Sequence, residues 1–411
     1  MRLKDVTECC PAYTGPDRNG TVAFVPMESL RYDSIDPKEI EYSEAKGKYT
    51  FFADGDLLFA KVTPCFENGN IAVARGLKGG IGFGSSEIFV LRPNDKLLNQ
   101  YLFYVAQGSP FRDGACATMC GVGGLKRIDP LFTRTFEFDL PSLSEQRAIV
   151  AYLDEKAAAI DRKVALLEKK LAAFKRLKTS IINRAVTRGL DPKVKLKDSG
   201  EDWIGKVPVG WEVTHLKRLT KKIGSGKTPS GGAEIYSAEG VMFLRSQNVY
   251  DEGLLLDDVA FISHDIDSKM ASTRVFYGDV LLNITGGSIG RCCVYTRHEH
   301  ANVNQHVCII RADANHVHNA YIKYFWNTLG QVYLRMSQLG GNRESLNFEQ
   351  IGNALFPCPR LAEQIAIADY LDAECAKIDK AAAVAEKQID AYRRLKRSLV
   401  NEVVTGKRKV A

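Results

Sequence analysis

Two stretches of the chain carry apolar residues at the alternating three- and four-residue spacing of a long amphipathic helix. They cover residues 145–187 and 363–405, contain no proline or glycine, and are rich in the helix-favouring residues Ala, Leu, Lys, Glu and Arg. At 1.5 Å per residue, each stretch predicts a helix of roughly 60 Å. A helix of that length extends beyond a small domain, so its apolar stripe needs a partner along its length.

The two stretches repeat each other. Aligned without a gap at an offset of 218 residues, they agree at 21 of 43 positions. The other copy is therefore the obvious partner, and the pattern predicts a paired coiled coil. An alternative stays open, in which each helix packs only on its own domain, because heptad patterns this short are ambiguous. The predicted seam comprises Ile160, Val164, Leu167, Leu171 and Phe174 in the first copy, and Ile378, Ala382, Ala385, Ile389 and Tyr392 in the second.

Both helices have a marked beginning. Ser142 precedes the first helix and Glu145 follows three positions later, which is the spacing of a capping box. The second copy keeps a proline, Pro359, and the glutamate, Glu363, but offers no Ser or Thr cap. One seam position of the first helix is charged, because Lys178 interrupts the apolar stripe there.

The segments before the helices consist of short β-branched and aromatic runs separated by Gly, Asn and Asp clusters. They repeat more faintly: GDLLFAKV at 55–62 resembles GDVLLNIT at 278–285, and SEIFVLR at 86–92 resembles QHVCIIR at 305–311. The predicted fold class is α/β (α+β), with two mixed globules that are each followed by a long helix. The predicted domains are a first globule over 1–140, a long helix over 141–187, a connector over 188–211, a second globule over 212–358 and a second long helix over 359–411.

The composition is that of a soluble globular protein with two or three domains, since 45% of the 411 residues are hydrophobic and 26% are charged. The N-terminus lacks the apolar segment of a signal peptide, and no run approaches the roughly 18 apolar residues of a membrane helix. We therefore predict a cytoplasmic protein without membrane contact. The ten cysteines lie in pairs such as Cys9 and Cys10 or inside apolar runs, which favours reduced thiols. Cys116, Cys120 and the histidines within 298–318 form no set with zinc-ligand spacing, so no metal site is predicted.

The net charge of +7 does not by itself indicate nucleic-acid binding. Residues 1–140 hold 16 basic against 18 acidic side chains, and residues 198–360 hold 16 against 17. The excess lies in 141–197, with 14 against 6, and in 361–411, with 10 against 8. Charged residues beside a heptad seam are usually solvated, so we interpret the helices as a spacer and a docking surface.

The stretch IGSGKTPSGG at 223–232 is close to a nucleotide-binding loop. A loop of the type G-x-x-x-x-G-K-[ST] needs a glycine five positions before Gly226, and Lys221 occupies that place. Such a loop also opens into a helix, whereas the proline and glycines that follow Thr228 are typical of turns. The stretch therefore predicts no ATP site and needs another explanation.

Together these features resemble the specificity subunit of Type I restriction-modification systems. The resemblance is carried by LPSLSEQRAIVAYLD at 140–154, PCPRLAEQIAIADYLD at 357–372, the connector GLDPKVKLKDSGEDWIGKVPVGWEV at 189–213 and SGKTPSGG at 225–232. It implies two target-recognition domains that each read one half of a split double-stranded DNA sequence, held by two antiparallel helices with pseudo-two-fold symmetry. The first globule lacks the lead-in DSGEDWIGKVPVGW and any equivalent of SGKTPS, and its weak similarity to the second globule predicts a different half-site.

The resemblance also implies partners. The helices are expected to dock two methyltransferase subunits, which in turn recruit motor-nuclease subunits. S-adenosylmethionine, ATP and magnesium would belong to those partner subunits, and no cofactor to this chain.

A DNA reader needs basic side chains for phosphates and side chains that form paired hydrogen bonds to base edges. The second globule crowds basic residues into 217–227, and FLRSQNV at 243–249 adds types that read guanine or adenine. GVGGLKRIDPLF at 121–132 is the counterpart in the first globule of a glycine-flanked stretch in the second. The predicted DNA-binding residues are Lys217, Arg218, Lys221, Lys222, Lys227, Arg245, Ser246, Gln247, Asn248, Asn342 and Arg343 in the second globule, and Lys61, Asn68, Asn70, Arg75, Lys78, Lys126 and Arg127 in the first.

No catalytic residues are predicted. The chain lacks the N-P-P-Y type of motif that amino-methyltransferases need, and a PD-(D/E)xK nuclease site built from Pro16, Asp17, Glu44 and Lys46 would fall in turn-rich sequence. Two hypotheses of different class remain. We favour a non-catalytic, sequence-specific DNA-binding subunit, and the alternative is a coiled-coil scaffold that joins proteins without reading DNA.

Overall fold

A computed structural model describes residues 1–17, 19–121, 124–229, 231, 235–338 and 345–410. Contacts within the chain divide it into two compact units. Unit 1 consists of Met1–Lys169 and Ala385–Ala411, and unit 2 consists of Lys170–Val384. Because the two boundaries fall inside the two long helices, each helix contributes one part to each unit.

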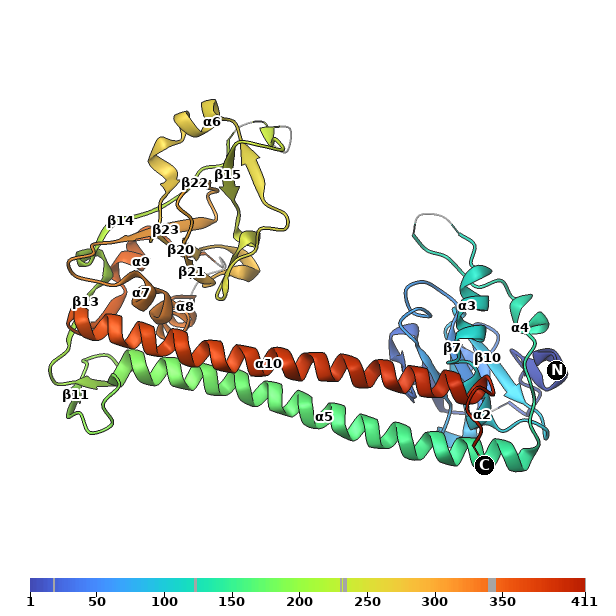
Figure 1. The fold of residues 1–411 in the computed structure, drawn as a ribbon. Coiled ribbons are helices and arrows are strands. Elements are labelled where there is room, and N and C mark those ends of the chain that lie inside the picture. Colours follow the sequence, from blue (N-terminus) through green and yellow to red (C-terminus); the bar gives the residue numbers. More distant parts are fainter. Residues whose placement is uncertain (18, 122–123, 230, 232–234, 339–344, 411) are drawn as a thin grey trace. The chain divides into compact units, whose positions relative to one another are not determined.

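The first globule is built from two four-stranded sheets (Figure 1). The first sheet is antiparallel and has the order β1 (Thr7–Cys9), β10 (Ile88–Pro93), β7 (Leu57–Ala60), β8 (Ile71–Val73). The second has the order β5 (Lys38–Glu41), β2 (Thr21–Val25), β9 (Ile81–Gly84), β6 (Thr50–Ala53), and β2 runs parallel to β9. A short hairpin of β3 (Leu30–Arg31) and β4 (Ser34–Ile35) contacts β8.

The core of the first globule lies between the first sheet and the helices that follow it. Buried Leu57, Phe59 and Leu91 pack with Leu102 of α2 and Phe111 of α3. Apolar side chains from the two long helices join the same cluster. The short helices of this globule are α1 (Tyr42–Ala45), α2 (Asn99–Val105), α3 (Ser109–Ala117) and α4 (Phe132–Thr135).

The second globule has the same topology, strand for strand. Its first sheet has the order β14 (Thr220–Ser225), β23 (Val307–Ala312), β20 (Val280–Asn283), β21 (Cys292–Val294). Its second sheet has the order β18 (Ala260–Ile262), β15 (Val241–Leu244), β22 (Ala301–Val303), β19 (Arg274–Val275), again with one parallel pair, β15 and β22. The hairpin is repeated as β16 (Val249–Tyr250) and β17 (Gly253–Leu254).

The second unit adds a strand pair in the connector and extends to two strands a pairing that is a single antiparallel bridge, between Arg2 and Glu137, in the first. The connector contains the antiparallel pair β11 (Leu196–Asp198) and β12 (Lys206–Pro208), and β13 (Glu212–His215) pairs with β24 (Leu355–Cys358). The helices of the second globule are α6 (His264–Lys269), α7 (Asn319–Trp326), α8 (Leu329–Gln338) and α9 (Phe348–Asn353).

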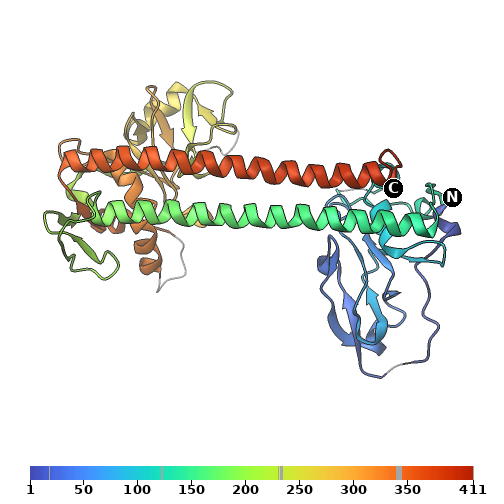
Figure 2. The ribbon, with the colours of Figure 1, turned by 60° about the horizontal axis from the view of Figure 1, so that its bottom comes forward.

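The long helices are α5 (Leu143–Arg188) and α10 (Leu361–Val404). In unit 1 the first part of α5 lies beside the last part of α10, and in unit 2 the last part of α5 lies beside the first part of α10 (Figures 1 and 2). Ion pairs join the helices in each unit: Lys396 with Asp161, and Lys178 with Asp379. Two mixed globules, each followed by one of two antiparallel paired helices, confirm the predicted fold class.

The predicted seam positions face away from solvent to different degrees. Ile160, Ile378, Ala385 and Ile389 are buried. The helix ends also belong to the globule cores, as Leu153 and Val403 do in unit 1. The half-buried seam residues are Val164, Leu167, Leu171, Phe174, Ala382 and Tyr392.

The start of α5 has the capping interactions that the sequence predicts. The Ser142 N–H donates to Glu145 Oε2 at 2.9 Å, and the Glu145 N–H donates to Ser142 Oγ at 3.4 Å, which confirms the capping box. The next residue, Gln146, is fully buried and has its counterpart in Gln364 of α10. Each glutamine side chain donates to two carbonyls and accepts one N–H, so it ties its helix to the preceding globule. The partners are Lys96, Pro141 and Leu98 for Gln146, and His316, Pro359 and His318 for Gln364.

Candidate nucleic-acid interface

The basic cluster of the second globule surrounds the start of β14. Lys217, in the 3₁₀ turn Leu216–Arg218, lines a cavity of about 260 Å³ together with Lys221 and Lys222 of the strand. The structure therefore brings three predicted residues together, and Arg218 lies exposed beside them.

Internal partners hold all three lysines of this cavity. The Lys217 ammonium donates to Asn353 Oδ1 at 2.7 Å, and the Lys222 ammonium donates to the Ser272 carbonyl at 2.5 Å. Lys221 Nζ lies 3.6 Å from the Asp313 carboxylate but keeps much of its side chain in solvent. Burial lowers the pKa of Lys222. Of the three, Lys221 is the side chain freest to meet a phosphate.

The GSGKT stretch starts with Gly224 and Ser225, the last residues of strand β14, and continues beyond the strand. A Cβ on Gly226 would lie 1.7 Å from the Val303 carbonyl oxygen, so this position needs glycine because two backbones approach closely. The Lys227 N–H donates to the same carbonyl at 3.2 Å, and the Lys227 side chain is exposed. The glycine thus serves backbone packing, and no helix begins within the described residues 226–229.

The RSQN stretch forms a turn that is stabilised from inside. The side chains of Arg245 and Gln247 converge on Asp258: Arg245 Nη2 donates to its carbonyl at 2.8 Å, and Gln247 Nε2 donates to its carboxylate at 2.6 Å. Asn248 is 1% exposed and bonds the backbone on both sides of the turn, so it supports the loop and does not face a base. The carbonyl of Ser246 accepts from Asn283. Asn342 and Arg343 lie outside the described residues.

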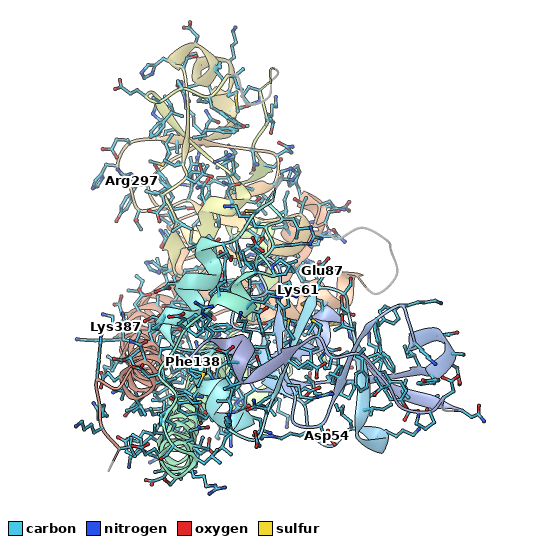
Figure 3. All side chains as sticks on the ribbon, turned by 90° about the vertical axis from the view of Figure 1, so that its right-hand side faces the viewer. Asp54, Lys61, Glu87, Phe138, Arg297 and Lys387 are labelled. Carbon is cyan, nitrogen blue, oxygen red and sulfur yellow. The ribbon has the colours of Figure 1, made fainter. Side chains whose placement is uncertain are left out.

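In the first globule, Lys61 and Arg127 meet at Glu87. The Lys61 N–H donates to the Glu87 carbonyl at 2.8 Å, and the two residues lie side by side in Figure 3. Arg127 donates to the Glu87 carboxylate through Nε at 3.0 Å and Nη2 at 2.9 Å, and these bonds lower the pKa of Glu87. The Lys61 ammonium donates to the Ser86 carbonyl at 2.7 Å, whereas Lys126 bonds Thr63 only through its backbone and leaves its side chain exposed.

The other candidates of the first globule contact different elements. Arg75 bonds Gln100 of α2, and Lys78 bonds Glu39 of β5 at 3.0 Å. Asn68 is exposed and Asn70 half-buried, in the turn before β8. In the described part of the chain, no side-chain hydrogen bond joins these four residues to one another.

Two groups of side chains are not among the residues predicted from the sequence. The ring of Tyr277 is 62% exposed and stacks on His298, with centroids 5.2 Å apart and planes 3° apart. Arg112, Arg394 and Arg397 line a cavity of about 590 Å³ in unit 1. In the sequence, only the run RRLKR at 393–397 points to this cavity, and such a run is typical of a solvated helix face.

Within the described ranges, no three His, Cys, Asp or Glu side chains gather in a way that could hold a metal ion. All ten cysteines carry free thiols. The described helices include none that is both long and apolar enough to cross a membrane.

Part of the chain is similar to a known protein family. The family model described as the Type I restriction modification DNA specificity domain matches residues 208–384. The second globule is thus similar to the Type I restriction modification DNA specificity domain. The matched range covers the second globule and the part of α10 that packs on it, including β14 with its GSGKT end.

Curated members of the Type I specificity family match over parts of their length. The EcoEI specificity subunit of Escherichia coli is 36% identical over 154 residues, which is 36% of this chain and 26% of that protein. The EcoAI specificity subunit of Escherichia coli is 29% identical over 205 residues, or 49% of this chain and 34% of that protein. The chain thus spans about a quarter to a third of these relatives' length.

Solved structures from type I restriction-modification systems match the fold over nearly the whole chain. A chain from a study of complex assembly and conformational transition in the type I R-M system aligns with a TM-score of 0.77 at 18% identity, covering 99% of this chain and 97% of that one. The HsdS subunit of Thermoanaerobacter tengcongensis aligns with a TM-score of 0.52 at 18% identity, covering 99% and 96%. At this identity the likeness concerns the fold.

Proposed function

We propose that this chain is the DNA sequence-specificity subunit of a Type I restriction-modification complex, which reads a bipartite double-stranded target with recognition domains over 1–140 and 212–358. One observation carries the proposal: the same two-sheet globule occurs twice, each time ahead of a long helix. Two readers on one chain suit a target made of two separated half-sites. The family match over 208–384 supports the second reader, and the shared strand order extends that support to the first.

The proposed DNA contacts are the candidates whose side chains remain exposed. They are Lys217, Arg218, Lys221, Lys227 and Gln247 in the second globule, and Asn68, Arg75, Lys78, Lys126 and Arg127 in the first. Side chains that already hold internal partners would have to exchange them on binding. This applies to the half-buried Lys61, Lys222 and Arg245 and also to the exposed Lys217, Lys221, Gln247, Arg75, Lys78 and Arg127. Ser246 and Asn70 are half-buried, and Asn248 is left out because it is buried and bonded inside its loop.

The outer faces of the helix pair are the proposed docking surface for two methyltransferase subunits. Leu166 and Leu177 of α5 are exposed, and Val384 and Leu395 are exposed at the equivalent positions of α10. Large apolar side chains that a repeated helix leaves in solvent at matching places favour a protein partner. Two copies of one surface suit two copies of one partner.

The remaining chemistry belongs to other subunits. Motor-nuclease subunits join through the methyltransferases, and those partners bind S-adenosylmethionine, ATP and magnesium. This chain is a non-catalytic, cofactor-free subunit of the complex, and the complex acts in the cytoplasm.

A methylation assay tests the proposal. The methyltransferase subunits are incubated with genomic DNA with and without this chain, and modified adenines are mapped. We expect methylation at one bipartite sequence only when the chain is present. Site-specific methylation without the chain would refute the proposal, and so would the absence of any sequence preference with it. In the second case, fluorescence anisotropy against random duplexes would distinguish a scaffold, which shows no preference at any salt concentration.

A further inference from the structure

Each long helix carries one lysine inside its apolar seam, and the two lysines are equivalent by the internal repeat. Lys178 of α5 and Lys396 of α10 are separated by the 218-residue offset of the repeat and continue the heptad spacing of their helices. Their side chains are only 24% and 16% exposed. A lysine in a seam lowers the stability of a coiled coil relative to leucine, so its presence in both copies calls for another role.

Both lysines bind an aspartate of the opposite helix, again at equivalent positions. Lys396 Nζ lies 2.9 and 2.7 Å from the two carboxylate oxygens of Asp161, and Lys178 Nζ lies 2.8 Å from both oxygens of Asp379. Burial opposes the charge of Lys396, yet the bonds to Asp161 leave its pKa raised. A shift of one heptad would move the partners about 10 Å apart, so each pair defines the helix register in its own unit.

The same lysines also meet the tip of a globule hairpin. In unit 1, Lys396 Nζ lies 4.8 Å from the ring centroid of Tyr32, which joins β3 to β4 and donates its hydroxyl to Gln107 at 2.7 Å. In unit 2, Lys178 Nζ lies 4.0 Å from the carboxylate of Glu252, which joins β16 to β17. The tip is aromatic in one globule and acidic in the other, and both are attractive to an ammonium group.

We propose that Lys178 and Lys396 are positioning residues for DNA reading: each seats the hairpin of its globule on a helix pair of defined register, and together they restrict the spacing between half-sites that the subunit accepts. The inference rests on the proposed function. Without the lysine contact, a globule keeps its base-contacting surface but is held less rigidly on the helices. The preferred half-site sequence should therefore stay the same, while the preference for one spacing between half-sites weakens. Methionine at the same position would fill the seam with a side chain of similar length and no charge.

The experiment uses the full complex with Lys396→Met, Lys178→Met and both together. Adenine methylation is measured on duplexes that carry the native half-sites at the native spacing and at spacings one base pair longer or shorter. We expect each single variant to reduce the preference for the native spacing about tenfold. The half-site sequences should stay unchanged, and the melting temperature should be equal to or above that of the unsubstituted protein.

Two controls make the test specific. Lys396→Arg retains the charge and should restore strict spacing. Arg393→Met removes the exposed interhelical bond from Arg393 to Glu168, 2.9 Å long, and should leave spacing discrimination intact. Strict spacing in both lysine variants would overturn the inference, and so would variants that lose stability and methylation together. Failure of the unsubstituted complex to methylate a bipartite site would instead reject the proposed function.

Discussion

Arg92 and Asp56 form a bidentate ion pair across the first sheet, from Nε to Oδ1 at 2.8 Å and from Nη2 to Oδ2 at 2.7 Å. The Asp56 side chain is 2% exposed and also accepts the Ala53 N–H at 2.7 Å. The second globule repeats the pair with the same two distances, between Arg311 and Asp279. Each pair joins the start of one strand to a neighbouring strand of the same sheet.

Removing one partner of this pair should destabilise the first globule. Arg92→Met leaves the buried Asp56 carboxylate without its counter-charge, and we expect a loss of about 3 kcal/mol in the free energy of unfolding. Arg127→Met is the control, because its pair with Glu87 is exposed and its loss should change the free energy of unfolding little. Urea denaturation followed by circular dichroism measures both variants. Equal losses would contradict the structural role of the Arg92 pair.

Gly226 tests the explanation of the GSGKT stretch. Gly226→Ala places a Cβ against the Val303 carbonyl. We expect this variant to lower the free energy of unfolding by about 2 kcal/mol or more and to disrupt the backbone pairing around this position in the second globule. Gly224→Ala is the matched control, because a Cβ there meets only the end of Lys222 at 4.0 Å. Thermal unfolding compares them, and similar melting temperatures would show that the close approach is unimportant.

The adjacent thiols Cys9 and Cys10 predict a pH-dependent reactivity. Their Sγ atoms lie 3.9 Å apart, and the hydrogen bond from Cys9 lowers the pKa of Cys10 to about 6. Only the thiolate is nucleophilic, so alkylation of Cys10 by iodoacetamide should rise as pH passes through 6. Cys116 is exposed but burial raises its pKa, so it should react only at higher pH. Mass spectrometry of the labelled peptides gives both profiles. In Cys9→Ala the Cys10 profile should move to higher pH, and an unchanged profile would contradict the assignment.

Lys227 should contribute to DNA affinity through a phosphate. Its side chain is exposed beside the basic cluster of β14. If it neutralises one phosphate, Lys227→Gln should reduce the slope of log affinity against log salt concentration by about 1, without changing the preferred sequence. Lys206→Gln, an exposed lysine of β12 in the connector, should leave the slope unchanged. Anisotropy titrations at several salt concentrations measure the slopes.

The exposed leucines of α5 should matter for partner stoichiometry. Leu166→Glu combined with Leu177→Glu places charges on a surface that we propose to be covered by a methyltransferase subunit. We expect the complex to retain one of its two methyltransferase subunits, as native mass spectrometry would show, while the isolated chain unfolds as before. Leu190→Glu, also exposed but in the connector, should keep both subunits. Two subunits retained in the double variant would place the docking surface elsewhere.

The helix pair was predictable from the sequence because its signals are local. The capping box of Ser142 and Glu145 marks the start of α5 at Leu143, and the heptad spacing predicts which side chains turn inward. The strand order was not predictable. In the first sheet β10 lies between β1 and β7, and these pairings join segments that are distant in the chain. Faint repeats such as GDLLFAKV predict that strands exist, but a run of apolar residues does not identify the strand with which it pairs.

The sequence by itself determined the duplicated plan, the two long helices and the resemblance to a family, because each of these follows from local spacing and repetition. Only the tertiary structure decided which basic side chains are free for DNA, because the groups that hold them come from elsewhere in the chain. Lys217 is bonded by Asn353, 136 residues away, and Lys222 by the Ser272 carbonyl, 50 residues away. In the sequence, Lys178 interrupts the apolar seam. In the structure, it forms an ion pair with Asp379 of the other helix, and the equivalent lysine repeats this contact.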